Sequence, residues 1–418
     1  MSAEEREWPS GMGTDPLGEA AQGTGKGKLA SLIEVWGVST KLGLTSFGGP
    51  IAHLGYFHDE YIRRRKWMDE RSYADLVALC QFLPGPASSQ VGIGIGMIRA
   101  GWLGGLVAWL GFTLPSVIAL VAFAFLLQGF DIGNIGWIHG LKIVAVAIVA
   151  HAVLGMGQKL TPDRARITIA IIAMGITLSW QTAYSQVLII AAAGLFGLLF
   201  YRQKAVAGSQ NLAVPISKVL AISCLILFFG LLLLLPVVRQ WGGDVKGLAM
   251  FDSFYRSGSL VFGGGHVVLP LLQREVVPTG WVTGEDFLAG YGAAQAVPGP
   301  LFTFAGYLGA MSGGISGAIL AIIAIFLPAF LLVAGVLPFW NGLRKNPKVQ
   351  GALTGVNAAV VGILLAALYD PLWTTAVADS KDFILAAVLF IMLVFWKLPP
   401  WVIVLTGAAG GWMLGLIH

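Results

Sequence analysis

The motifs Phe47-Gly48-Gly49-Pro50 and Pro84-Gly85-Pro86 interrupt apolar segments in the first half of this chain. Both interruptions return in the second half, as Phe262-Gly263-Gly264 and Pro298-Gly299-Pro300, in the same order and at almost the same separation. Because glycine and proline break helices, irregular backbone is placed twice within apolar sequence. Such backbone is tolerated at membrane depth only where it faces protein or a water-filled cavity. Matched interruptions in two halves of a chain are typical of a transporter binding site.

Residues between and around the motifs indicate that the whole chain is duplicated. When the two halves are aligned on these motifs, further residues correspond: Lys41 to Arg256, Glu60 to Glu275, Trp67 to Trp281, Gln81 to Gln295, Gly104 to Gly317, Pro115 to Pro328, Leu141 to Leu353 and Val149 to Val361. The offset in residue number between equivalent residues changes by only a few positions along this series. We predict a disordered cytoplasmic tail over 1–28, a first repeat over 29–205, a linker with an extra transmembrane helix over 206–240, and a second, inverted repeat over 241–418.

The composition is that of a helical membrane protein. Of the 418 residues, 56% are hydrophobic and 11% are charged, and the mean hydropathy is +0.79. These values exclude a soluble domain. The predicted spans contain the apolar runs Leu103–Leu127, Ile143–Met156, Ile167–Leu178, Val187–Phe200, Val219–Val238, Ile315–Leu337, Val356–Leu368 and Phe383–Phe395. With their flanks, these runs approach the length of about 20 residues that a span requires.

Positive charge predicts the orientation. When the runs are taken as crossings, all but six of the 26 Lys and Arg fall on one side of the membrane, and the positive-inside rule makes that side cytoplasmic. The exceptions are Lys142, Arg239, Lys246, Arg256, Arg274 and Lys381. Five crossings separate the two copies, counting the unmatched run Val219–Val238. Because five is odd, we expect the copies to be inverted about an axis in the membrane plane. The excess of Lys and Arg on one side is explained by the membrane topology and requires no nucleic-acid partner.

Each half should begin with broken elements. A helix over Leu29–Ser46 stops at the first motif and restarts over Ile51–Arg64, and Tyr73–Phe82 and Ser88–Ile98 flank the second motif. These pieces are too short to span easily, so we predict two re-entrant hairpins, or one broken span plus one hairpin, per half. The fold class is therefore an all-α polytopic membrane protein whose two inverted repeats carry broken helices that meet near the midplane. Glycine pairs at spacing four suit close helix crossings, namely Gly92/Gly96, Gly101/Gly105, Gly309/Gly313 and Gly313/Gly317.

Helices that begin inside the membrane favour an anion. The starts at Pro50, Ala87, Gly265 and Leu301 would aim unpaired N–H groups and positive dipole ends into the gap between them. The hydroxyls of Ser88, Ser89 and Thr303 offer further donors. This arrangement fits a small tetrahedral oxyanion.

The ionisable residues near the breaks leave alternatives open. The Lys41 and Arg256 cations precede their breaks by six residues and are candidate anion ligands, although pairing with Glu34 or Asp252 explains them equally well. Glu60 and Glu275 are candidate proton carriers, and for Glu60 an interfacial ion pair is the plainer interpretation.

Histidine and glutamine also follow the repeat. His53 and His266 could lie beside the substrate and titrate near neutral pH, or could simply be hydrogen-bonded structural residues. Gln81 and Gln295 could bind the substrate or satisfy carbonyl groups freed by the breaks. The scattered histidines have no partners at ligand spacing, so we expect neither a metal site nor a cofactor.

The two Phe-Gly-Gly breaks, with His53 after the first and His266 in the second, and the strings Gln81-Phe82-Leu83-Pro84-Gly85-Pro86 and Gln295-Ala296-Val297-Pro298-Gly299-Pro300 resemble the chromate ion transporter family. The resemblance covers roughly residues 30 to 415, in the long form with two fused halves. It implies proton-coupled antiport of chromate out of the bacterial cytoplasm, resistance to chromate, a multi-pass inner-membrane location with a cytoplasmic N-terminus, and sulfate as a look-alike anion.

The family motif falls on matched residues of the two halves. The substrate-binding candidates are therefore Lys41, Phe47, Gly48, Gly49, His53, Gln81, Pro84, Gly85, Pro86, Ser88, Arg256, Phe262, Gly263, Gly264, Gly265, His266, Gln295, Pro298, Gly299, Pro300 and Thr303. One departure is that Gly265-His266 stands where the first break has Pro50.

Other function classes remain open to different degrees. A sulfate importer or an anion channel would use the same helix ends. A membrane-embedded enzyme is the remote alternative, because the sequence contains no His-Glu-x-x-His, Gly-x-Ser-x-Gly or Walker motif. The expected partners are chromate, protons and lipid, and the oligomeric state, including a homodimer, is not determined by the sequence.

Overall fold

A computed structural model describes residues 25–129, 136–180, 182–201, 216–241, 245–262, 264–343 and 346–416, and these residues contain helices joined by loops. The first copy comprises α1 (Gly25–Thr45), α2 (Gly49–Phe57), α3 (Glu70–Phe82), α4 (Ala87–Gly129), α5 (Gly136–Leu160), α6 (Arg164–Ser179) and α7 (Ala183–Phe200). The second comprises α9 (Lys246–Ser259), α10 (Val268–Val276), α11 (Gly284–Ala294), α12 (Phe304–Val336), α14 (Pro347–Ala367), α16 (Ser380–Val394) and α17 (Pro400–Leu416). Short helical segments occupy His58–Arg64, Gly265–Val267, Leu301–Thr303, Leu337–Phe339, α13 (Trp340–Leu343), Leu368–Trp373 and α15 (Thr374–Ala376).

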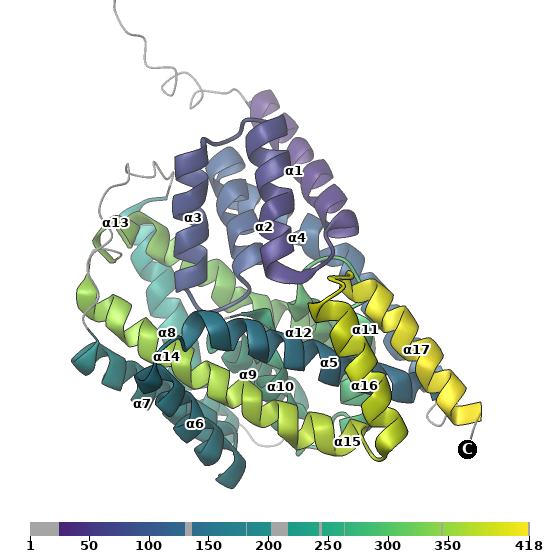
Figure 1. The fold of residues 1–418 in the computed structure, drawn as a ribbon. Helices are drawn as coiled ribbons and strands as arrows, with labels where there is room; N and C mark the ends of the chain where they lie inside the picture. Colours follow the sequence, from purple (N-terminus) through teal and green to yellow (C-terminus); the bar gives the residue numbers. More distant parts are fainter. Residues whose placement is uncertain are drawn as a thin grey trace, which may run out of the picture.

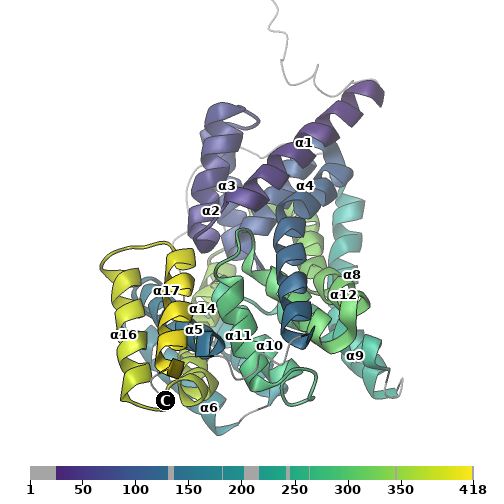
Figure 2. The ribbon, with the colours of Figure 1, turned by 90° about the vertical axis from the view of Figure 1, so that its right-hand side faces the viewer.

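The helices recur in the same order in each copy, and the extra helix α8 (Lys218–Trp241) lies between the copies. α1, α2 and α3 lie together at one end of the molecule, whereas α9, α10 and α11 lie toward the other end (Figures 1 and 2). α1 begins at Gly25, four residues before the predicted start, so it enters the stretch assigned to the tail. The rest of that tail, residues 1–24, lies outside the described residues.

Five described helical segments are long and apolar enough to cross a membrane: Ala87–Gly129, Gly136–Leu160, Lys218–Trp241, Leu301–Phe339 and Pro347–Ala376. The chain is thus a multi-pass helical membrane protein. The runs Ile167–Leu178 and Phe383–Phe395 do form helices, but α6 and α16 have only 16 and 15 residues. At 1.5 Å per residue, these helices are shorter than a hydrocarbon core of about 30 Å. The sequence runs also omitted α17, a shorter apolar helix of 17 residues.

α4 and α12 each fold back on themselves as a helical hairpin. In α4, Ala100 and Gly101 leave helical geometry, and Gly101 has a φ of 68°. A Cβ added to Gly96 would collide with the carbonyl oxygen of Gly104, and one added to Gly104 would collide with that of Gly96. Residues eight apart in a straight helix are about 12 Å apart, so the chain must reverse between them.

The second copy repeats this reversal and corrects part of the glycine prediction. Gly314 has a φ of 62°, and Gly309 meets Gly317 in the same close contact. Gly96 and Gly309 therefore serve close packing, as expected. Gly101 and Gly313 do not, because a Cβ at either position would meet nothing within 4 Å. These two glycines belong to the turns of the hairpins, where the chain must reverse.

The two copies are intertwined beyond these hairpins. α5 of the first copy packs along α16 and α17 of the second, and α14 of the second packs along α6 and α7 of the first (Figure 1). Both contacts depend on small residues: Gly140 lies against the backbone of Gly407, and Gly197 against that of Gly351. Such close backbone approach gives membrane helices their van der Waals attraction. Each copy therefore completes the outer layer of the other.

Substitution of Gly104 tests the hairpin. We expect Gly104→Ala to lower the melting temperature of the purified protein in detergent, because overpacking against backbone costs about 1–3 kcal/mol or more. Gly230→Ala in α8 is the matched control, since its Cβ would meet nothing within 4 Å and alanine favours a helix by about 1 kcal/mol. Equal melting temperatures for the two variants would contradict the hairpin.

Candidate functional site

The four interrupted loops are joined in pairs across the copies. The backbone N–H of Gly85, in the first Pro-Gly-Pro loop, donates to the carbonyl oxygen of Val261 at 2.7 Å. The N–H of Gly299, in the second loop, donates to the carbonyl oxygen of Ser46 at 2.9 Å. Val261 and Ser46 immediately precede the Phe-Gly-Gly breaks and are equivalent in the duplication. Each Pro-Gly-Pro loop thus holds the break of the other copy, and we call these two hydrogen bonds and their loops the crossing.

Glycine is required at the crossing by backbone conformation and by space. Gly85 and Gly299 have φ values of 117° and 95°, a region that other residues rarely adopt. A Cβ on Gly299 would collide with the Ser116 hydroxyl of α4, which donates to the Pro298 carbonyl. A Cβ on Gly85 would lie 3.6 Å from Ala329 of α12, the repeat partner of Ser116. The two loops therefore face equivalent positions of α4 and α12, with a collision at Gly299 and an ordinary van der Waals contact at Gly85.

The helix starts converge at the crossing. Gly48 and Gly49 have φ values of 96° and 78° and allow α2 to restart with Pro50 in its first turn. A Cβ on Gly265 would lie 3.6 Å from the Pro50 ring and 3.8 Å from Leu301. The starts of α2, of the segment before α10 and of the segment before α12 are therefore neighbours.

The fourth start joins this group through a histidine. His53 Nδ1 lies 3.3 Å from the Ser88 hydroxyl, which links α2 to the first turn of α4. Positive dipole ends of helices from both copies therefore lie close together.

A small cavity lies between the starts of α2, of the segment before α10 and of the segment before α12. It is lined by Gly48, Gly49, Pro50, His266, Ala294, Gln295, Val297, Gly299, Leu301 and Pro400. Its volume of about 20 Å³ suffices for one water molecule. An oxyanion with four oxygen atoms requires the loops to separate.

Several polar groups around the crossing lack partners. Among the described residues, the hydroxyls of Ser46 and Ser89 and the Nε2 atom of Gln295 are buried without a hydrogen bond. Ser46 and Ser89 are only 0% and 2% exposed. A buried polar group without a partner costs about 1–3 kcal/mol. These groups therefore mark the crossing as a polar site within an apolar fold.

The first-copy cation lies away from the small cavity. Lys41 Nζ donates to Glu60 at 2.8 Å, and Arg65 Nε donates to the other oxygen of Glu60 at 3.0 Å. Burial opposes ionisation of Glu60, but the hydrogen bonds and charges of Lys41 and Arg65 outweigh it and hold the pKa of Glu60 below its usual value. Glu60 is therefore ionised at neutral pH. Glu34 is engaged by Arg65 and Arg99, each at 3.0 Å, so it is not the partner of Lys41.

The equivalent pair in the second copy is more deeply buried. Arg256 contacts Glu275 and Asp252, both at 2.7 Å. Arg239 of α8 also binds Asp252 at 3.1 Å, and the Ser253 hydroxyl donates to Glu275 at 2.8 Å. Asp252 and Glu275 are buried. The repeat thus conserves a cation–glutamate pair, and neither Lys41 nor Arg256 lines the cavity at the crossing.

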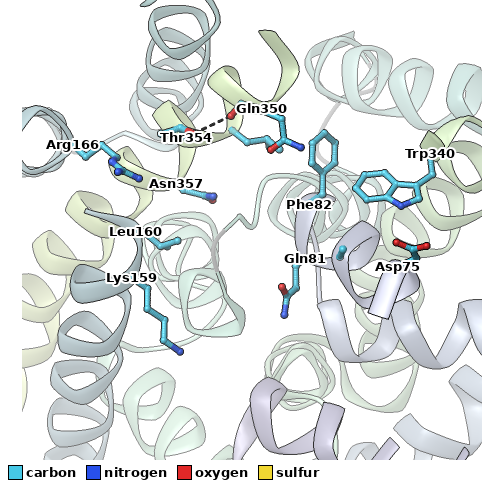
Figure 3. A pocket seen from close by; sticks show the side chains of 12 residues that line it. Asp75, Gln81, Phe82, Lys159, Leu160, Arg166, Trp340, Gln350, Thr354 and Asn357 are labelled. Atoms are coloured by element: carbon cyan, nitrogen blue, oxygen red, sulfur yellow. Dashed lines mark hydrogen bonds between the residues drawn. The ribbon is translucent and has the colours of Figure 1, made fainter. Parts of the chain in front are cut away.

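The equivalent glutamines face different cavities. Gln295 lines the cavity at the crossing. Gln81 instead lines a larger cavity of about 390 Å³ between α3, the α5–α6 corner and α14 (Figure 3). Lys159, Arg166 and Asn357 lie on one side of this larger cavity, and Gln81, Phe82 and Trp340 on the other.

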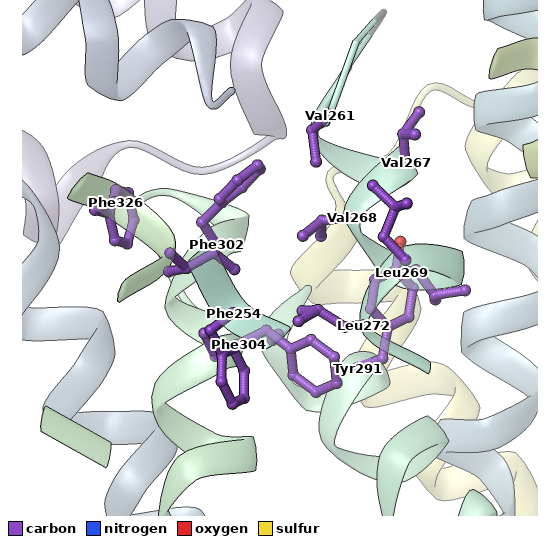
Figure 4. Close-up of a cluster of buried hydrophobic side chains, with 14 of the residues drawn as sticks. Phe254, Val261, Val267, Val268, Leu269, Leu272, Tyr291, Phe302, Phe304 and Phe326 are labelled. Carbon is purple, nitrogen blue, oxygen red and sulfur yellow. The ribbon is translucent and has the colours of Figure 1, made fainter. Parts of the chain in front are cut away.

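Apolar side chains support the second break from within. Val261, Val267 and Val268 pack with aromatic residues of α9, α11 and α12 (Figure 4). All members are at most 2% exposed: Phe254, Val261, Val267, Val268, Leu269, Leu272, Tyr291, Phe302, Phe304 and Phe326. This packing holds the irregular backbone in one position. The Tyr291 hydroxyl lies 2.7 Å from His266 Nδ1 and orients that ring.

The remaining candidates occupy the loops themselves. The Thr303 hydroxyl, predicted as a donor, donates to the Pro300 carbonyl at 2.7 Å and closes its own loop. The Pro84 carbonyl accepts from Gln90 Nε2 at 2.7 Å. Phe47, Pro86, Phe262 and Gly264 complete the loops, whereas Gly263 lies outside the described residues.

The sequence prediction missed Ser46, Ser116, Val261 and Pro400. Ser46 and Val261 could have been found from position alone, because the last carbonyl groups before a break are free to accept. Ser116 and Pro400 carried no such signal.

Comparison with known proteins gives the family. The model of the chromate transporter family matches residues 33–198 and again residues 248–412. The chain belongs to the chromate transporter family. The chromate transport protein of Pseudomonas aeruginosa is 30% identical over 392 residues, which cover 90% of each chain. The probable chromate transport protein of Synechococcus elongatus is 29% identical and covers 88% of this chain and 92% of its own. No solved structure matched significantly.

Substitution of Gly299 tests the crossing in this family member. We expect Gly299→Ala to be destabilising, because an alanine at positive φ costs about 1–2 kcal/mol and crowding against Ser116 adds about 1–3 kcal/mol. Gly280→Ala is the matched control, since Gly280 has a φ of 72° with open space around it. Melting temperature and anion transport should both fall further in the first variant. Equal losses would show that crowding at the crossing contributes nothing.

Proposed function

We propose that this protein exports chromate from the cytoplasm in exchange for protons and so confers chromate resistance, and that chromate binds at the crossing. The observation that carries this proposal is the convergence of helix starts from both copies on one polar place. A doubly charged tetrahedral oxyanion offers four acceptor oxygens, which match N–H groups arriving from several directions. Similarity to proteins named for chromate transport over about 90% of the chain favours chromate among such anions.

Transport requires the crossing to open. The cavity of about 20 Å³ is too small for the anion, so the two Pro-Gly-Pro loops must part from the opposite breaks. The Ser46, Ser89 and Gln295 groups that lack partners among the described residues would then meet substrate oxygens. Lys41 and Arg256 do not line the cavity and are paired with carboxylates, so the helix starts rather than these cations would bind the anion. Binding would relieve buried polar groups that otherwise cost free energy.

Of the two candidate proton carriers, we favour Glu275. Glu60 contacts three basic residues, one of which, Lys41, is half exposed, and its pKa is lowered. Glu275 lies among buried groups, accepts from Ser253 and shares Arg256 with Asp252. Loss of the Glu275 charge would leave Arg256 paired with Asp252, so a proton can be held there without exposing a bare cation.

The same proposal includes an inverted arrangement of the copies in the bacterial inner membrane, with the N-terminus in the cytoplasm. It is supported by the placement of α1, α2 and α3 at one end of the molecule and of their repeat partners α9, α10 and α11 toward the other end (Figures 1 and 2), as an inverted second copy requires. The positive-inside bias of the sequence supports the orientation. Whether the working unit is a monomer or a homodimer does not alter the site.

Uptake of labelled chromate into everted vesicles tests the function. We expect uptake to rise when the vesicle interior is acidified, because export by proton exchange runs inward in everted membranes. Sulfate in excess should compete weakly. Uptake that follows voltage alone would indicate a channel, and accumulation of sulfate by intact cells would indicate an importer.

The two glutamates provide a matched test of coupling. We expect Glu275→Gln to abolish the stimulation by the proton gradient while downhill chromate movement continues, because the amide cannot take up a proton. Glu60→Gln, its repeat partner, should keep the stimulation. If Glu60→Gln alone abolishes it, the proton carrier lies in the first copy instead.

A further inference from the structure

The two copies differ at one pair of equivalent interfaces. In the second copy, α11 packs along α5. Gly292 is so close to α5 that an added Cβ would collide with the Leu141 carbonyl. Lys142 of α5, which is buried, also pairs with Glu285 of α11 at 3.4 Å. This interface is closely packed, and the ion pair lies at its edge, where the Glu285 side chain is exposed.

The equivalent interface of the first copy is open. The register of the duplication relates Gly292 to Ala78 of α3, and Leu141 to Leu353 of α14. Among the described residues, α3 has no packing against α14 comparable to that of α11 against α5. Ala78 and Leu353 both line the cavity of about 390 Å³ that separates the two helices. Residues that touch in one copy thus stand apart in the other.

The lining of this cavity suits an anion in transit. Lys159 and Arg166 supply positive charge, and the side-chain amides of Gln81 and Asn357 supply donors. Arg166 is held by Asp163 at 2.6 Å, which leaves Lys159 as the more adaptable cation. Asp75 lies beside Trp340, on the side away from Lys159 and Arg166 (Figure 3). Gln81 lies three residues before the Pro-Gly-Pro loop, so the helix that forms one wall of the cavity continues into the crossing.

We propose that the cavity between α3 and α14 is the open entrance by which the oxyanion reaches the crossing, and that the α5–α11 contact is the repeat-related entrance in its closed form. The oxyanion role rests on the proposed function, whereas the difference in access does not. The entrance lies on the side of Lys159 and Arg166, which the charge bias assigns to the cytoplasm. Exchange of the two arrangements, with α3 closing on α14 while α11 leaves α5, would move access to the other side.

Thiol labelling tests the access. Leu353→Cys and Leu141→Cys are the same substitution at equivalent positions, and the native Cys80 and Cys224 are buried and give the background. In everted vesicles, a membrane-impermeant maleimide should label Leu353→Cys at least about tenfold faster than Leu141→Cys. Adding Glu285→Gln, which breaks the pair with Lys142, should raise the labelling of Leu141→Cys in right-side-out vesicles several-fold. Equal labelling of the two cysteines, or no effect of Glu285→Gln, would overturn the assignment of open and closed entrances.

Transport kinetics test the oxyanion role separately. Lys159→Gln should raise the KM for chromate roughly two- to fivefold with little change in kcat, because a unit charge near a divalent anion acts on its capture. Lys159→Arg should restore the KM, and Lys381→Gln, on the opposite predicted face, is the control. An unchanged KM in Lys159→Gln would overturn the entrance as an anion path. If the wild-type protein moves no chromate, the proposed function fails, but the labelling result still decides the access.

Discussion

The structure depends on a constraint that the bilayer imposes: backbone that leaves a helix at membrane depth must find hydrogen-bond partners in protein. Here each copy satisfies the irregular backbone of the other. Gly85 donates to Val261 and Gly299 donates to Ser46. The breaks can therefore exist only in pairs, and their position at the centre follows from that pairing. The helix starts that could hold an anion are brought together by the same two bonds.

Much of this arrangement was predictable from sequence because it depends on residue types that have few roles. Positive φ angles at Gly48, Gly49, Gly85 and Gly299 follow from the repeated motifs, and so do the four helix starts. The pairing of Lys41 with Glu60 was not predicted, although both residues belonged to the repeat. Contacts between side chains 19 residues apart depend on how a hairpin closes, which sequence spacing does not show.

The reversals within α4 and α12 were predicted only in part. The sequence separated the helix Ser88–Ile98 from the run Leu103–Leu127, but Gly101 was interpreted as a packing glycine, because a tight reversal and a close helix contact use the same small residue. The φ of 68° at Gly101 and the contact between Gly96 and Gly104 distinguish the two cases. The sequence likewise did not show that α11 packs against α5 whereas α3 stands apart from α14, because duplicated residues predict equal contacts in the two copies. The two copies of a duplicated chain must differ in structure if the crossing is to be open to one side of the membrane and closed to the other.

The exchange of outer helices between the copies affects how the chain can assemble during synthesis. α5 is covered by α16 and α17, and α17 begins only at Pro400, more than half the chain after α5 ends at Leu160. One flank of α5 therefore faces lipid until α16 and α17 have been synthesised. Glycines such as Gly140 offer lipid chains little side-chain surface on that flank. Assembly of the first copy thus includes a docking step in which α16 and α17 displace lipid from α5.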